Sequence, residues 1–75
     1  MKATERKARA LAKSLGCTVS KIKSDARGCF DIEVFAPDGY VFPFGNYSNV
    51  TTGDNASAWA DVIERLKTEP PIKED

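Results

Sequence analysis

The stretch from residue 29 to residue 36, Cys-Phe-Asp-Ile-Glu-Val-Phe-Ala, constrains the fold more than any other part of the chain. Its residues alternate in the way expected of a strand with one buried face. The predicted buried face carries Phe30, Ile32 and Val34. The opposite face carries Asp31, Glu33 and Phe35. Because only one face is strongly apolar, we expect helices to cover the sheet on that side alone.

Two amphipathic helices are predicted on either side of the strand region. Residues 4–15 repeat small and aliphatic side chains at three- and four-residue steps, and Gly16 follows where a left-handed residue would end a helix. A second helix is predicted to begin at Asp54 or Asn55 and to run to about Thr68. The apolar stripe of this second helix carries Trp59, Val62, Ile63 and Leu66.

A first hairpin is predicted to join residues 17–23 to the central strand through a turn. Pairing of Lys23 with Cys29 would place Ile22 on the core face. The same register would place Val19 on the exposed face, opposite an acidic residue. A bulge or a slip of one residue would remove that conflict.

The third strand is predicted at Tyr40–Phe44, because Pro37-Asp38-Gly39 is a strong hairpin turn. In the register of that turn, Phe35 and Val41 pair on the exposed face, and the aromatic residues of the new strand join the core. The predicted fold class is therefore α+β, a two-layer domain with the order α-β-β-β-α. Its three-stranded antiparallel sheet has both helices on one face.

Two segments are predicted to lie outside regular structure. Residues 45–54 read as a polar loop longer than a simple connection requires, and surplus loop length is where binding residues concentrate. Tyr47 is the one large side chain of that loop. Residues 70–75 are expected to form a flexible C-terminal tail after a single domain of residues 1–69.

The charges are balanced in number but not in position. The chain has 11 basic and 11 acidic residues, yet residues 1–28 hold eight basic groups against two acidic ones. On the first helix the basic residues form a stripe predicted to face solvent, made of Lys2, Arg6, Arg9 and Lys13. Such a stripe either meets phosphates or an acidic protein surface, or is an ordinary solvated helix face.

The predicted order of helix, three strands and helix resembles that of double-stranded RNA-binding domains. In that family, phosphate contacts come largely from a basic cluster at the start of the second helix and from a motif in the first hairpin loop. Here the second helix opens with the acidic run Asp54-Asn55-Ala56-Ser57, and residues 24–28 lack the family's Gly-Pro-x-His type of loop. The resemblance therefore covers element order and no motif.

A second resemblance rests on the Ala36–Phe42 hairpin and on Trp59. These features look like those of small uncharacterised proteins encoded by phages and prophages, over about half of the chain. This resemblance implies an accessory protein of a mobile element that acts on a host or viral partner. It brings no known activity.

Composition argues against several classes of function. The chain has no histidine, which disfavours most catalytic triads and most zinc sites. Cys17 and Cys29 are predicted to lie near opposite ends of one hairpin and so to remain free thiols. Asp31 and Glu33 share a sheet face, but an exposed face supplies no cleft for acid–base catalysis. We therefore expect no enzyme, no cofactor and no metal site.

The leading hypothesis is a small non-enzymatic module that binds an unidentified protein partner. The expected surface is the exposed sheet face together with the 45–54 loop, and its candidate residues are Phe35, Val41, Tyr47 and Asn49. The alternative is weak nucleic-acid binding through the basic stripe of the first helix. No signal peptide or membrane span is apparent, so we expect a cytoplasmic protein that does not bind membranes. The expected state is a monomer or a weak dimer through the exposed sheet face or edge.

Overall fold

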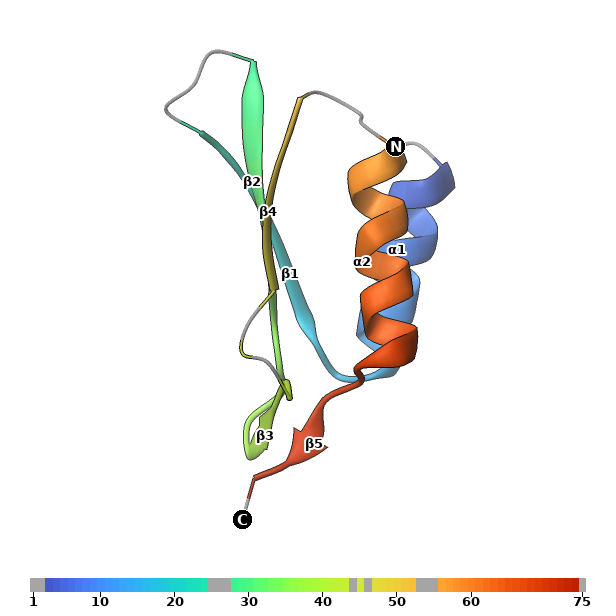
Figure 1. Ribbon diagram of the computed structural model, residues 1–75, viewed down its shortest axis with the longest axis vertical. Coiled ribbons are helices and arrows are strands. Elements are labelled where there is room, and N and C mark those ends of the chain that lie inside the picture. The colour runs from blue at the N-terminus through green and yellow to red at the C-terminus, as the bar shows by residue number, and fades with distance from the viewer. Residues whose placement is uncertain (1–2, 25–27, 44, 46, 53–55, 75) are drawn as a thin grey trace.

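The computed structural model describes residues 3–24, 28–43, 45, 47–52 and 56–74 (Figure 1). Along the chain these form α1 (Ala3–Ser14), β1 (Thr18–Lys23), β2 (Cys29–Phe35), β3 (Tyr40–Val41), β4 (Tyr47–Thr52), α2 (Ala56–Thr68) and β5 (Ile72–Lys73). Figure 1 shows α1 and α2 side by side on one face of the sheet made by β1, β2 and β4. The α+β class and the helices on one face are confirmed. The other face of the sheet carries no helix of the described chain.

The predicted glycine stop of α1 has the geometry of a Schellman motif. Gly16 has a φ of 76°, which a residue with a side chain adopts only with strain. Its N–H donates to the carbonyl of Lys13 at 3.0 Å, and the N–H of Cys17 donates to the carbonyl of Ala12 at 2.8 Å. Ala12 and Cys17 are both buried. The motif therefore turns the chain from the helix directly into β1.

The first hairpin has the slipped register rather than the simplest one. Lys23 pairs with Phe30, and Val19 pairs with Val34. The prediction that Ile22 faces the core is wrong, because a slip of one residue moves every side chain of a strand to the opposite face. Ile22 is 53% exposed, and Lys21 takes a place on the helix side of the sheet.

The third strand lies later in the chain than predicted. It is β4, inside the segment expected to be a loop. Of the predicted strand Tyr40–Phe44, only Tyr40–Val41 is a strand among the described residues, and it does not pair with β2. β4 pairs with β2 from Cys29–Thr52 to Val34–Tyr47, which is nearly the full length of β2. The predicted strand contains Pro43, which cannot donate to a ladder, whereas β4 is rich in β-branched residues. The predicted pair of Phe35 with Val41 is consequently wrong.

The C-terminal segment is ordered where a tail was expected. The Pro37-Asp38-Gly39 turn does form, with a φ of 83° at Gly39 and a 3.0 Å hydrogen bond from the N–H of Tyr40 to the carbonyl of Pro37. It leads into β3, which pairs with β5 instead of with β2. The N–H of Glu74 also donates to the carbonyl of Gly39 at 2.8 Å. β3 and β5 make a separate two-stranded ribbon at one end of the molecule (Figure 1).

The core lies between the two helices and the sheet. Trp59 is fully buried, which confirms its predicted place, and it is the largest side chain of the core. Phe42 is also buried, although it belongs to no strand. The buried apolar set is completed by Ala8, Ala12, Cys17, Ile32, Val34, Ala58, Val62 and Leu66.

Candidate binding surfaces

The side of the three-stranded sheet that faces away from α1 and α2, which we call the outer face, carries no helix of the described chain. Strand alternation and register place ten residues on it. They are Thr18, Ser20, Ile22, Cys29, Asp31, Glu33, Phe35, Ser48, Val50 and Thr52. Three of them are large apolar residues with high exposure: Ile22 at 53%, Phe35 at 36% and Val50 at 58%.

Two carboxylates occupy the middle of the outer face. Asp31 stands between Ile22 of β1 and Val50 of β4, so apolar side chains flank it on both sides. Glu33 stands between two serines. Neither carboxylate lies within ion-pair distance of a basic side chain in the described chain. The outer face therefore combines exposed apolar groups with negative charge that its own residues do not neutralise.

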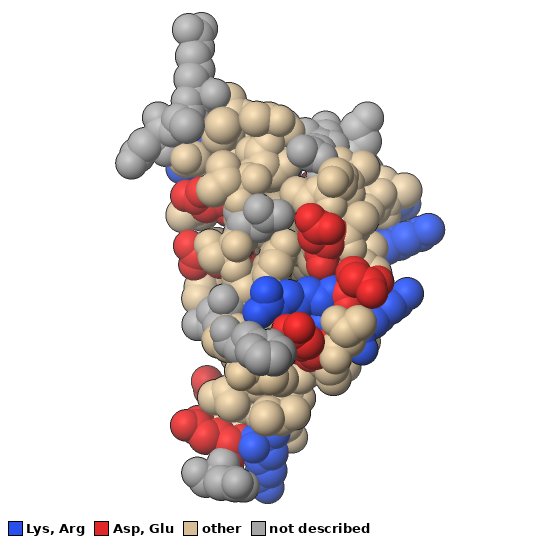
Figure 2. Space-filling view, viewed as in Figure 1, with Lys and Arg blue, Asp and Glu red and all other residues tan. Residues whose placement is uncertain are grey.

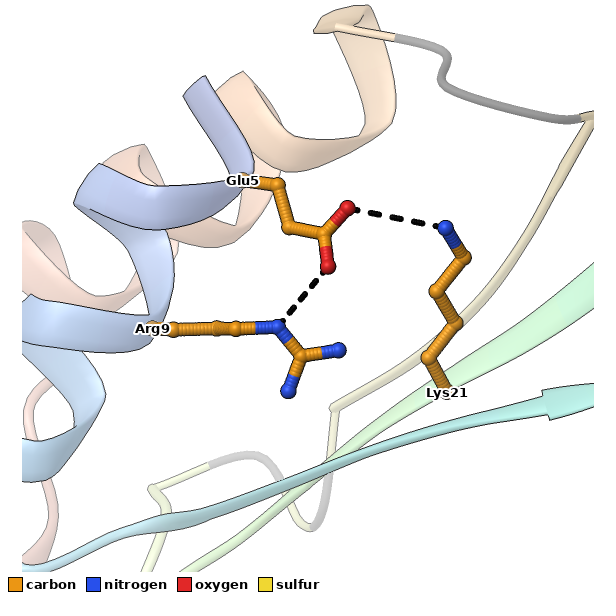
Figure 3. Close-up of polar contacts among 3 residues, drawn as sticks. All are labelled: Glu5, Arg9 and Lys21. Carbon is orange, nitrogen blue, oxygen red and sulfur yellow. Dashed lines mark hydrogen bonds and ion pairs between the residues drawn. The ribbon is translucent and has the colours of Figure 1, made fainter. Parts of the chain in front are cut away.

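The opposite side of the sheet holds a carboxylate of a different kind. Glu5 of α1 is only 6% exposed, and two cations neutralise it (Figure 3). The Nε of Arg9 lies 2.9 Å from its Oε2, and the Nζ of Lys21 lies 3.5 Å from its Oε1. This cluster, Glu5–Arg9–Lys21, ties α1 to β1 between the helix layer and the sheet.

The same two cations also cover aromatic rings. The guanidinium carbon of Arg9 lies 5.3 Å from the centroid of Trp59, and the Nζ of Lys21 lies 4.8 Å from that of Phe30. The indole Nε1 of Trp59 has no hydrogen-bond partner in the described chain. The Trp59 ring is thus held by packing and by cations rather than by its polar atom.

The basic stripe predicted on α1 is interrupted. Arg6 and Lys13 are exposed, as expected. Arg9 is wrongly placed by that prediction, because it is half-buried against Glu5 and Trp59. Lys2 lies outside the described residues. In Figure 2, most of the basic side chains in view lie on the helix side, whereas acidic side chains lie both over the helices and along the sheet side.

The residues predicted to bind a protein partner do not form one surface. Phe35 lies on the outer face, whereas Val41 lies in the ribbon, where it pairs with Ile72. Tyr47 packs against the core, with the guanidinium carbon of Arg65 5.1 Å from its ring centroid. Asn49 pairs with Ile32 in the ladder, and its side chain lies outside what the structure describes.

Sequence reasoning missed Ile22 and Val50 as surface residues. The conflict at Val19 in the simplest hairpin register was the signal for Ile22, since the slip that removes it turns Ile22 outward. The signal for Val50 was the run of β-branched residues that makes β4 a strand rather than a loop.

The ribbon is a second exposed apolar region. Val41 and Ile72 pair directly across it and are 39% and 52% exposed, and Tyr40 is 43% exposed.

The described residues form no pocket and bring together no set of side chains suited to hold a metal ion. Neither helix of the described chain is long and apolar enough to cross a membrane. Comparison with protein-family models, with curated proteins and with solved structures found no match.

Proposed function

We propose that this protein is a small non-enzymatic module that binds a protein partner on the outer face of its sheet. The observation that carries this proposal is the exposure of Ile22, Phe35 and Val50 on a face that no described element covers. Exposed apolar groups beside polar ones are typical of protein interaction sites. A phage or prophage accessory role would fit such a module.

The outer face sets the scale of the interaction. Three strands of about six residues span roughly 20 Å by 14 Å, or about 300 Å² in plan. A standard stable interface takes about 800 Å² from each partner. We therefore expect a transient complex, unless the partner also reaches the ribbon with Tyr40, Val41 and Ile72.

Site-specific photo-crosslinking in cells of the source organism tests the proposal. A photoreactive amino acid is placed at Ile22 or at Val50 on the outer face, and at Ala10 on the exposed side of α1 as the control. We expect the outer-face positions to capture a discrete protein that the α1 position does not. Capture of the same proteins from all three positions would contradict the proposal.

A matched pair of variants then separates the two exposed apolar regions. In Ile22→Ser, Val50→Ser the outer face loses two apolar side chains, and in Val41→Ser, Ile72→Ser the ribbon loses two. We expect the first variant to lose binding of the captured partner and the second variant to retain most of that binding. The reverse result would move the binding surface to the ribbon.

Weak nucleic-acid binding through α1 is the alternative function. Arg6, Lys7 and Lys13 are exposed on that helix and take part in no ion pair of the described chain. A phosphate-binding helix should bind duplex RNA or DNA at low salt and lose affinity steeply as salt rises. Absence of binding at low salt would eliminate this alternative.

A further inference from the structure

We propose that the partner of the outer face presents cationic side chains, lysine or arginine, among apolar ones. This inference rests on the proposed function and names the chemistry of the partner. Its basis is the pair of carboxylates, Asp31 and Glu33, at the centre of the outer face.

The position of these carboxylates is the first step. β2 is the central strand of the sheet, with β1 and β4 on its two sides. Aspartate, and to a lesser degree glutamate, is depleted in strands. In the middle of a central strand, neither side chain contributes apolar packing. Asp31 and Glu33 point to the same side about 7 Å apart, so their charges repel each other.

The absence of internal compensation is the second step. The hairpin could have supplied cations, because β1 contains Lys21 and Lys23. The observed register places both lysines on the helix side of the sheet, and Lys21 neutralises Glu5 there. The cross-strand neighbours of Asp31 and Glu33 are all uncharged.

A second copy of this chain does not fit the same face. Two stacked sheets lie about 10 Å apart, so stacking outer face on outer face would bring four carboxylates together. Burial of like charges without partners costs more than the apolar contacts of Ile22 and Val50 would return. The charge pattern therefore selects a different protein whose surface is positive where this face is negative.

The register also fixes how the charges of the partner should be arranged. Its cations should lie over the line of β2, and its apolar groups should lie to either side, against Ile22 and Val50. Phe35 extends the apolar contact at the end of β2. The chain as a whole has no net charge, so attraction of a basic partner would come from this local pattern and not from a global field.

Selection from a random 12-residue peptide library displayed on phage tests this chemistry without knowledge of the natural partner. We expect the enriched peptides to combine lysine or arginine with apolar residues. Amide chemical shifts of the labelled protein should then change at Ile22, Asp31, Glu33 and Val50 when an enriched peptide is added.

Two matched variants raise the net charge of the chain by the same two units. Asp31→Asn, Glu33→Gln removes the outer-face carboxylates, and Asp61→Asn, Glu64→Gln removes two exposed carboxylates of α2. We expect the first variant to bind an enriched peptide at least about tenfold more weakly than the wild type, a loss of about 1.4 kcal/mol, and the second to bind it unchanged.

Enriched peptides without cations, no enrichment at all, or equal loss in both variants would overturn the inference. The crosslinking result separates this failure from failure of the proposed function. Capture at Ile22 or Val50 together with neutral or acidic selected peptides would leave the binding face in place and remove only the partner chemistry.

Discussion

The two sides of the sheet treat carboxylates in opposite ways. On the helix side, Glu5 is buried and is neutralised by Arg9 and Lys21. On the outer face, Asp31 and Glu33 lie beside uncharged neighbours and take part in no ion pair of the described chain. The difference separates charge that the fold neutralises from charge that it leaves without an ion pair.

The lysines of β1 follow the same division between the two sides of the sheet. In the register shifted by one residue, Lys21 and Lys23 would lie on the outer face, where they would neutralise Asp31 and Glu33. The observed register turns them toward α1 and α2 instead. Lys21 then covers Phe30 and neutralises Glu5, so its role belongs to the helix side.

The largest effect on stability should come from removing the Trp59 ring, which lies at the centre of the core on the helix side of the sheet. Trp59→Ala should lower the free energy of unfolding by about 3 to 5 kcal/mol, because Trp59 is fully buried. Urea unfolding followed by circular dichroism measures the change. Trp59→Phe should cost clearly less, since the indole N–H has no hydrogen-bond partner to lose. Wild-type stability in Trp59→Ala would show that the ring is not part of the core.

A smaller loss should follow when the buried carboxylate is neutralised. Glu5→Gln should cost about 1 to 3 kcal/mol, because two cations would lose their charged partner beside a buried group. The fluorescence of Trp59, the single tryptophan, reports unfolding at this cluster. Arg6→Gln is the control, since Arg6 is exposed on the same helix. An equal cost in both variants would mean that the cluster is no stronger than a surface pair.

Sequence reasoning succeeded where a local pattern was enough. The apolar stripe around Trp59 and the glycine stop of α1 depend on residues a few positions apart, and both are observed. The alternation in β2 also identified its buried face, since Ile32 and Val34 are both fully buried. These features together determine the α+β class.

Sequence reasoning failed where two distant segments competed for the same place. The edge of β2 could be taken by the segment after the Pro37 turn or by residues 47–52, and local turn chemistry favoured the first. Pairing along nearly the whole of β2 favours the second. The segment after the Pro37 turn pairs as β3 with the C-terminal β5 instead. No local sequence pattern predicted that pairing.

The candidate surface was only partly predictable for the same reason. Phe35, Asp31 and Glu33 were assigned to the exposed face correctly, because they alternate with the core residues of β2. Ile22 depended on a one-residue choice of register, and Val50 on which segment formed the third strand. The burial of Arg9 depended on Lys21 and Trp59, which lie on other elements.

The two cysteines give a chemical test of the two sides. Cys17 belongs to the core, and burial raises the pKa of its thiol above the usual value, whereas Cys29 lies on the outer face. Iodoacetamide should therefore modify Cys17 on the order of tenfold more slowly than Cys29 in the folded protein. Peptide mass spectrometry after timed quenching measures both rates, and the difference should vanish in urea. Equal rates in the folded protein would contradict the burial of Cys17.

The same pKa shift has a consequence for stability. Burial favours the protonated thiol of Cys17 in the folded state, so the folded chain holds that proton more tightly than the unfolded chain. This contribution is fully present below the ordinary thiol pKa of about 9.0 and declines as the pH rises through the higher pKa of the folded state. Cys17→Ser should show a flatter dependence of unfolding free energy on pH in that alkaline range than the wild type.

The smallest effect on stability should come from the outer face. Asp31→Asn, Glu33→Gln should change the unfolding free energy by no more than about 0.5 kcal/mol, because neither carboxylate has a charged partner to lose. Any change should be a gain at low salt that disappears at high salt, since the substitutions relieve a repulsion that ions screen. Urea unfolding at two salt concentrations measures both terms, with Asp61→Asn, Glu64→Gln as the control. A loss above about 1 kcal/mol would make the acidic pair structural. A change within about 0.5 kcal/mol would instead show that Asp31 and Glu33 are not needed for stability. That result is the one that the binding proposal requires.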